Sequence, residues 1–195
     1  KDIGFGITVS NNNSEDMLSL YRLSKALNME FATAAFHNSY YFHKDDNVIT
    51  NRDTVCGNFA ELINMQMREK HPKSWARAFF NMGLINYIEG NRRMLPCEAG
   101  LMNCFIDPYG DWKESMGNIR QANSFSDIWN SEQAQHVRSL VRKCPKNCWM
   151  VGTVSPVMKK FAYARHPMGW IIKNKLRSLL GKPVCLDKKW YDVGQ

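Results

Sequence analysis

The stretch Cys97-Glu-Ala-Gly-Leu-Met-Asn-Cys104-Phe-Ile-Asp-Pro-Tyr-Gly-Asp111 is followed downstream by Cys144-Pro-Lys-Asn-Cys148. Four cysteines therefore lie in turn-rich sequence, and a helical segment between the two stretches can bring them together. Thiolates grouped in this way, in a chain that shows no export signal, usually bind a metal ion or an iron–sulfur cluster. These cysteines are the first candidates for a functional site.

The composition is that of a folded protein with a basic surface. The 195 residues are 44% hydrophobic and 12% aromatic, which suits one core or one core with a small additional module. The net charge of +8 suits nucleic acid or an anionic membrane surface. No nucleic-acid-binding motif accompanies the charge, so we expect no nucleic-acid partner. The first residues resemble neither a signal peptide nor a spanning segment, and we expect reduced thiols in a cytoplasmic protein.

The first 90 residues show the pattern of an α/β fold. Residues 3–9 predict a buried strand, residues 14–28 a helix and residues 29–36 a second strand, which together form a βαβ unit. A long helical pattern then covers residues 50–89 and is interrupted at His71-Pro72. In parallel α/β sheets the functional site lies at the carboxyl ends of the strands.

Polar side chains follow both predicted strands and form a second group of candidates. Ser10 and Asn13 follow the first strand, and His37 and Tyr41 follow the second. An alternative interpretation is that residues 11–13 only form a turn that leads into the helix, which asparagine favours without any ligand. His37 has the alternative of being a hydrogen-bonded structural residue, since its chemistry alone decides neither role.

The region between the cysteines predicts a strand and a helix. Residues 105–106 read as a strand that enters a tight turn over residues 107–110, where Asp-Pro and Gly meet the dihedral requirements. Ser124 or Ser126 begins a helix that we expect to run to about Lys143. This helix would deliver Cys144 and Cys148 back toward Cys97.

Four pieces of this region together resemble a known family. They are Cys97-Glu-Ala-Gly with Ile106-Asp-Pro-Tyr-Gly110, then Met116-Gly-Asn-Ile, then Phe125-Ser-Asp-Ile-Trp129, then Cys144-Pro-Lys-Asn-Cys148. In their order and their residues they resemble the auxiliary-cluster domain of radical SAM enzymes, called SPASM, or twitch in its shorter form. The resemblance covers residues from about 91 to 150.

The resemblance implies a fold class and a domain order. The fold would be α/β, with the C-terminal half of a radical SAM partial (β/α) barrel over residues 1–90. A small cysteine-rich α+β SPASM/twitch-like domain with a hairpin and helices would follow over residues 91–150, and a basic amphipathic helical tail over residues 151–195.

The resemblance also implies a function, that of a radical SAM oxidoreductase or maturase. Such enzymes cleave S-adenosylmethionine at a [4Fe–4S] cluster held by a C-x3-C-x2-C motif, which this chain lacks. The partner would be the missing N-terminal half of the barrel. Ser10 and Asn13 would contact the nucleoside cofactor, while His37 and Tyr41 would face a substrate that is a peptide, a sugar or a lipid-linked precursor.

The same resemblance assigns an auxiliary [4Fe–4S] cluster to Cys97, Cys144 and Cys148. The family pattern expects a further cysteine where this chain has Ser115, and a hydroxyl is a poor ligand for iron. The fourth thiolate would come from Cys104, from Cys185, or from an additional loop between Asp111 and Trp112, where the sequence is short for the family.

Two alternatives to the iron–sulfur cluster remain open. Four thiolates also suit Zn²⁺, and the cysteines are otherwise simple free thiols. The alternative function is that of a non-catalytic, membrane-associated interaction module that binds Zn or Fe–S with the same cysteines.

The tail has its own pattern of basic and apolar residues. Residues 157–163 are helical and basic, Pro167 is expected to break the helix, and residues 170–181 resume it with Lys and Arg interleaved among Trp, Ile and Leu. The segment is too short and too charged to cross a bilayer. Its apolar side chains would rest on an anionic membrane surface or, as the alternative, pack against the preceding domain.

Overall fold

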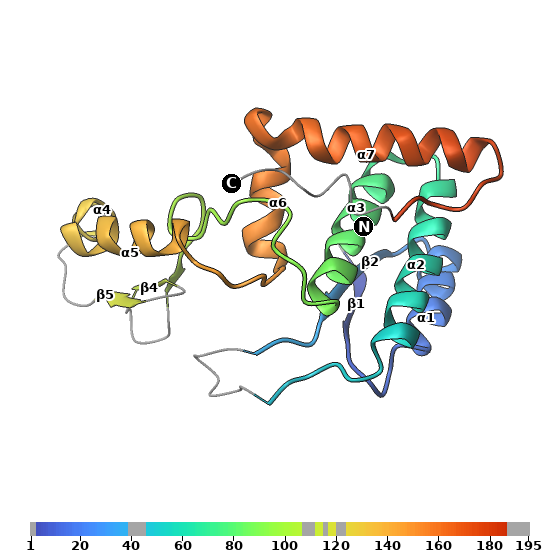
Figure 1. The fold of residues 1–195 in the computed structure, drawn as a ribbon, viewed down its shortest axis with the longest axis horizontal. Helices are drawn as coiled ribbons and strands as arrows, with labels where there is room; N and C mark the ends of the chain where they lie inside the picture. Colours follow the sequence, from blue (N-terminus) through green and yellow to red (C-terminus); the bar gives the residue numbers. More distant parts are fainter. Residues whose placement is uncertain (1–2, 39–45, 107–111, 115–116, 120–123, 187–195) are drawn as a thin grey trace. The chain divides into compact units, whose positions relative to one another are not determined.

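The computed structural model describes residues 3–38, 46–106, 112–114, 117–119 and 124–186. It divides the chain into two compact units. Unit 1 consists of Lys1–Met94, Asn147–Trp149 and Arg165–Gln195, and unit 2 of Leu95–Lys146 and Met150–Ala164. Figure 1 shows the elements, coloured along the chain.

Unit 1 begins with the predicted βαβ unit. Strand β1 (Gly4–Val9), helix α1 (Asp16–Ala26) and strand β2 (Glu30–Ala35) follow one another, and the two strands pair in parallel. The register places Val9 opposite Ala35, so both strands end at the same edge of the sheet. Alternating apolar side chains of each strand face the core, as period-two patterning requires.

Two helices of equal length form the core of unit 1. Helix α2 (Arg52–Arg68) and helix α3 (Pro72–Ile88) are separated at the predicted break, because proline suits the first position of a helix, where its missing N–H would have no partner within the helix. Both contribute side chains that are wholly buried, among them Phe59, Leu62, Ile63, Met67 and Leu84.

A series of hydrogen bonds between buried polar side chains links the helices to the sheet. Asn81 of α3 donates to Gln66 Oε1 of α2 across 2.9 Å, and its own Oδ1 accepts from the Thr33 hydroxyl of β2. Asn81 and Gln66 are almost fully buried. Since buried amides are costly without partners, this chain fixes the positions of α2, α3 and β2 relative to one another.

Helix α7 (Phe161–Leu179) continues through Pro167, so the expected break there is wrong. Proline removes one backbone hydrogen bond but does not end a helix that tertiary contacts hold. Trp170 is buried and meets Phe79 edge to face, and Lys175 Nζ donates to Met67 O and Glu69 O at the end of α2. Within unit 1, α7 therefore lies across the end of α2 and beside α3 (Figure 1).

Unit 2 contains a small sheet and three helices. Strands β3 (Phe105–Ile106), β4 (Trp112–Glu114) and β5 (Gly117–Ile119) pair antiparallel in chain order. The helices are α4 (Phe125–Asn130), α5 (Glu132–Arg142) and α6 (Val151–Lys159). The predicted turn at residues 107–110 lies outside the described residues.

The single helix predicted over residues 124–143 is wrong, because the chain forms two helices that meet at Ser131. The Ser131 hydroxyl accepts from Ala134 N at 3.1 Å and donates to Ile128 O at 2.8 Å. It therefore caps α5 and closes α4 with the same side chain. Ser124 caps α4 as expected, since its side chain accepts from Asp127 N.

The observed mixture of helices and small sheets agrees with the expected fold class in part. The described residues of the first unit form one two-stranded parallel sheet with helices, which does not establish a radical SAM barrel. The boundaries expected at residues 90 and 150 stay a prediction. Within the described ranges, every helix is too short or too polar to span a bilayer.

Candidate metal centre

The loop that joins Cys97 to Cys104 in unit 2 is a tight turn. Glu98 O accepts from Leu101 N and Met102 N, each at 3.0 Å, and Gly100 N donates to Asn103 O at 2.8 Å. Gly100 has a φ of 74°, in the left-handed region that favours glycine. The sequence Glu-Ala-Gly after Cys97 thus reverses the chain and brings it round to Cys104.

Two cations hold this loop to the helices of unit 2. Arg138 of α5 donates from Nε to Gly100 O at 2.7 Å, and its guanidinium stacks 4.5 Å from the Trp129 ring. Lys160, just after α6, pairs with the Glu98 carboxylate at 3.0 Å, and Glu98 is only 7% exposed. A buried carboxylate is tolerated only when paired, so this ion pair fixes the turn next to Cys97.

Three of the candidate cysteines are placed around α5. Cys97 packs against the apolar group of Ala99, Val137 and Val141. Cys104 packs with Ile128 and Trp129 against Ala134. Cys144 follows the helix directly, and its N–H donates to Val141 O at 3.2 Å.

The chemistry of these side chains fits a thiolate-bound cluster. All six cysteines of the chain are half-buried and none forms a disulfide. Asn103 Oδ1, next to Cys104, is buried without a hydrogen-bond partner. Among the described residues, however, no three His, Cys, Asp or Glu side chains are grouped tightly enough to hold a metal ion. The described residues thus include thiol side chains that could bind iron, but these thiols are not grouped as the ligands of one metal site.

Cys148 belongs to unit 1, where its two neighbours dock on α3. Asn147 Nδ2 donates to Tyr87 O and Asn91 O, at 3.2 and 3.0 Å, and Trp149 Nε1 donates to Phe80 O at 2.8 Å. The Trp149 ring lies directly over Gly83, since a Cβ built on this glycine would be 2.0 Å from Trp149 Cε2. Only glycine at position 83 allows this contact, which fixes the backbone of Cys148 on both sides.

Arg93 and Tyr87 complete the surroundings of Cys148. The Arg93 guanidinium donates to the Cys148 carbonyl and lies 5.5 Å from the centre of the Trp149 ring. Burial raises the pKa of Tyr87, and the negative charge of a Cys148 thiolate raises it further. Tyr87 is therefore a protonated hydroxyl in the electrostatic range of the Cys148 sulfur. Sequence reasoning did not identify Arg93, Tyr87 or Trp149 as neighbours of Cys148. The available signal was Gly83, an isolated glycine inside a helical pattern.

Cys185, the remaining candidate, is held by its backbone to α7 in unit 1. Its N–H donates to Asn174 Oδ1 at 2.6 Å, and its carbonyl accepts from Asn174 Nδ2 at 3.5 Å. Asn174 is fully buried. The loop expected between Asp111 and Trp112 is wrong, because these two residues are consecutive in the chain. Cys104 and Cys185 are then the candidates left for a fourth ligand.

The residues at the strand ends bond mainly to their own turn. Ser10 donates from both its N–H and its hydroxyl to Asn13 Oδ1, at 2.8 and 3.3 Å, and Asn13 Nδ2 donates to Thr8 O at 3.0 Å. Asn11 Oδ1 accepts from Thr50 N and Asn51 N, the residues that lead into α2. These contacts support the structural interpretation of residues 11–13 as a turn.

His37 lies beyond β2, at the same edge of the sheet as Ser10. It is half-buried, and its Nδ1 is 3.3 Å from Ala35 O. Its backbone carbonyl accepts from Asn47 Nδ2 at 3.0 Å. Tyr41 lies outside the described residues.

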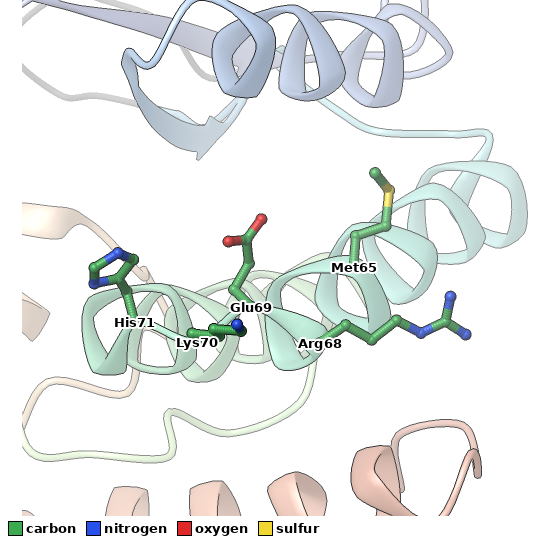
Figure 2. Close-up of a pocket in the computed structure, with 5 residues that line it drawn as sticks. All are labelled: Met65, Arg68, Glu69, Lys70 and His71. Atoms are coloured by element: carbon green, nitrogen blue, oxygen red, sulfur yellow. The ribbon is translucent and has the colours of Figure 1, made fainter.

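A surface hollow of about 460 Å³ occurs in unit 1 at the junction of α2 and α3. Figure 2 shows its five lining side chains, which fan out in different directions and do not converge on one point. They are Met65, Arg68, Glu69, Lys70 and His71. The hollow includes none of the residues that the sequence predicted for a site, and its divergent side chains do not make a reaction centre.

Comparison with known families gives a match for the cysteine region. Residues 87–150 match a family model described as SPASM, an iron–sulfur cluster-binding domain. The match confirms the resemblance read from the sequence and begins four residues before the expected start at residue 91. Searches of curated proteins and of solved structures give no significant match. This region of the chain is thus similar to iron–sulfur cluster-binding domains of the SPASM type.

Proposed function

We propose that the SPASM domain over residues 87–150 holds an auxiliary [4Fe–4S] cluster of a radical SAM oxidoreductase or maturase. The family match carries this proposal. It is supported by the half-buried thiols within the matched region, which form no disulfide, and by the two cations that fix the Cys97–Cys104 turn. When bound, such a cluster exchanges single electrons or holds a substrate group near the reacting centre.

The proposed ligands are Cys97, Cys144 and Cys148, with Cys104 or Cys185 as the fourth. Thiolates are the usual ligands of [4Fe–4S] clusters. The chain's own residues act by positioning these sulfurs: Arg138 and Lys160 fix the turn after Cys97, while Arg93 and Trp149 fix the backbone around Cys148. Reduced thiols require a reducing compartment, so we propose a cytoplasmic protein.

The catalytic part of this proposal needs a partner. An N-terminal half of the barrel would carry the C-x3-C-x2-C motif and cleave S-adenosylmethionine, since this chain contains no such motif. We propose that Ser10 and Asn13 contact the nucleoside and that His37 and Tyr41 face the substrate. The parallel register, which brings Ser10 and the start of the His37 segment to one edge of the sheet, supports this assignment. The substrate class, whether peptide, sugar or lipid-linked precursor, is left open by the proposal.

The first test is the metal content of the chain purified without oxygen. Iron, acid-labile sulfide and zinc are measured per chain, and the visible absorption spectrum is recorded on the same sample. About four iron and four sulfide per chain, as a [4Fe–4S] centre requires, support the proposal. A chain that stays free of iron after reconstitution with iron and sulfide overturns it.

The ligand assignment is tested by serine substitution. Cys97→Ser, Cys144→Ser and Cys148→Ser are each expected to lose most of the iron, because a hydroxyl does not replace a thiolate. Cys56→Ser is the matched control, since Cys56 is also half-buried but lies within α2. Cys104→Ser and Cys185→Ser separate the two candidates for the fourth ligand. An unchanged iron content removes the substituted residue from the site.

A second candidate function is a non-catalytic Zn or Fe–S binding interaction module. The absence of a C-x3-C-x2-C motif from these 195 residues favours it. Zinc binds four thiolates tetrahedrally, so one zinc per chain in place of iron would identify a structural site. A C-x3-C-x2-C motif encoded upstream in the same reading frame would instead favour the enzyme.

A further inference from the structure

The side chain of Arg93 is held beside Cys148 at two points. Its guanidinium donates to the Cys148 carbonyl and lies 5.5 Å from the centre of the Trp149 ring. Arg93, Cys148 and Trp149 all belong to unit 1, so both contacts lie within one compact unit. A guanidinium that is bonded to a backbone oxygen and also lies over an aromatic ring keeps its charge in one place.

The ring that holds Arg93 is itself fixed by α3. Trp149 is only 4% exposed, its Nε1 donates to Phe80 O at 2.8 Å, and its ring centre lies 6.3 Å from that of Phe80. The close contact with Gly83 leaves no room for the indole to approach α3 further. The packing of unit 1 therefore determines where the positive charge of Arg93 lies.

The bonds within a cysteine limit the distance from this charge to the sulfur. Four covalent bonds join the carbonyl oxygen of Cys148 to its Sγ, so these two atoms are about 3–5 Å apart. A nitrogen that donates to the oxygen is therefore within roughly 8 Å of the sulfur. This distance is shorter than the Debye length of about 10 Å at roughly 0.1 M ionic strength, so salt screens the interaction only in part.

A fixed positive charge at this distance acts on the electron affinity of a cluster bound to the sulfur. When such a cluster is reduced, it gains one electron, and no bond forms or breaks. A neighbouring cation stabilises the more negative, reduced form and so raises the reduction potential, which depends on the net charge around the cluster. The sign of this effect does not depend on other contacts of the guanidinium, since its removal always takes one positive charge from the surroundings of the sulfur.

We propose that Arg93 raises the reduction potential of the auxiliary cluster by holding a positive charge beside Cys148. This inference rests on the proposed function, because it takes Cys148 as a ligand of that cluster. Arg93 acts through Cys148, so it is a positioning residue and not a catalytic one.

The test is a redox titration of the 195-residue chain. The chain is reconstituted with iron and sulfide without oxygen and reduced stepwise with dithionite, which supplies the electron, and the reduced cluster is measured by electron paramagnetic resonance. Arg93→Gln removes the charge and keeps a side-chain donor. At a fixed potential, we expect this variant to have a ratio of reduced to oxidised cluster about tenfold lower, which is about 59 mV for one electron.

A conservative variant separates the charge of Arg93 from its structural role. Arg93→Lys keeps the positive charge but loses the planar group that lies over Trp149. We expect its ratio of reduced to oxidised cluster to stay within about threefold of wild type, since the charge decides the potential. If Arg93 only holds the loop, lysine and glutamine should change the potential alike, which would overturn the inference.

Arg68→Gln is the matched control. Arg68 is an exposed arginine of unit 1 at the end of α2, close to the start of α3. The segment of Cys148 docks near the other end of α3, since Asn147 bonds to Tyr87 O. The 17 residues of α3 span about 25 Å, so loss of the Arg68 charge should leave the potential unchanged. An equal shift in both glutamine variants would contradict a local effect of Arg93.

Iron and sulfide per chain are measured first for every variant. A wild-type chain that binds neither fails the proposed function, and the inference fails with it. A wild-type chain that holds the cluster, with an unchanged potential in Arg93→Gln, overturns the inference alone. Arg93→Met, whose apolar chain can still pack on Trp149, is a second neutral variant in case glutamine releases the cluster. Loss of the cluster from both neutral variants would assign Arg93 a structural role and overturn the inference.

Discussion

The two units of the chain differ in how their cores are built. In unit 1 the wholly buried side chains are large and include Phe59, Met17, Leu62 and Trp170. In unit 2 the described buried apolar residues are almost all small, namely Ala99, Ala134, Val137, Val141, Val154 and Val157, with Leu95. Because stabilisation follows the apolar area removed from water, unit 1 has the means to fold by burial alone.

This difference indicates that interactions other than apolar burial help to stabilise unit 2. Its turn is held by the Glu98–Lys160 ion pair and by Arg138, and the described apolar residues around α5 form two small groups. Small domains with little core are often completed by a metal centre, whose binding free energy becomes folding free energy. Thiolate ligation at Cys97 and Cys144 would contribute in this way to unit 2.

The largest expected effect compares one core position from each unit. Phe59→Ala should destabilise unit 1 by about 3–5 kcal/mol, because it leaves a large cavity among fully buried neighbours. Val137→Ala should cost unit 2 only about 1–2 kcal/mol, since the removed group is smaller. Hydrogen exchange read peptide by peptide measures each unit separately. Equal losses of stability in the two units would contradict the proposed difference between their cores.

The next effect concerns the contact between Gly83 and Trp149. Gly83→Ala should cost about 1–3 kcal/mol by overpacking, because the new Cβ would meet the indole at 2.0 Å. It should also lower the iron content, since Trp149 holds the backbone next to Cys148. Urea unfolding and iron analysis measure the two effects.

Gly57→Ala is the matched control for this prediction. Gly57 lies within α2, and a Cβ built on it meets no atom within 4 Å. The substitution should therefore stabilise the protein by up to about 1 kcal/mol through helix propensity. If Gly83→Ala and Gly57→Ala change the stability equally, the packing of Trp149 does not require glycine at position 83.

A smaller effect tests the junction of α4 and α5. Ser131→Ala removes the hydroxyl that caps α5 and should cost about 1 kcal/mol, confined to unit 2. Ser131→Asp retains an acceptor for Ala134 N and should recover most of the loss. Hydrogen exchange over residues 124–143 is the measurement, and an effect that spreads into α2 or α3 would contradict the separation of the units.

The smallest effect is a pH dependence in unit 1. A hydrogen bond from Lys73, with the charge of Arg77 beside it, lowers the pKa of Glu30. The contribution of this carboxylate to stability is therefore present above its ordinary pKa and is lost as the pH falls through its lower pKa in the folded protein. Since Glu30 is exposed, we expect only a few tenths of a kcal/mol. Glu30→Gln should be less stable than wild type near neutral pH, and the gap should close in acid.

Local sequence signals were sufficient for most elements of unit 1. The alternating strands, the helix between them and the break at Pro72 all follow from patterns within a few residues. The four motif pieces of residues 97–148 were likewise sufficient to recognise the SPASM domain. These predictions succeeded because each depends on residues that are close together in the chain or in a fixed order.

The failures have a common physical cause. Pro167 lies within a helix because Trp170 and Asn174 pack in the core, and the sequence near Pro167 does not reveal those partners. The Trp149–Gly83 contact joins residues that are 66 positions apart. Ser131 is the exception, since a serine followed by Glu132 is a local signal for a helix start that the longer helical pattern concealed.

The hydrogen bonds from Lys175 to the end of α2 have a consequence for synthesis of the chain. Lys175 and Met67 are 108 residues apart, and Val184 and Asn64, which also bond, are 120 apart. At about 5–20 residues per second, the ribosome releases α2 and α3 roughly 5–20 s before α7. During that interval Phe79 lacks the indole of Trp170, so an apolar surface of the nascent chain is open to chaperones and to aggregation. The first unit to be made is thus completed only by a segment made about a hundred residues later.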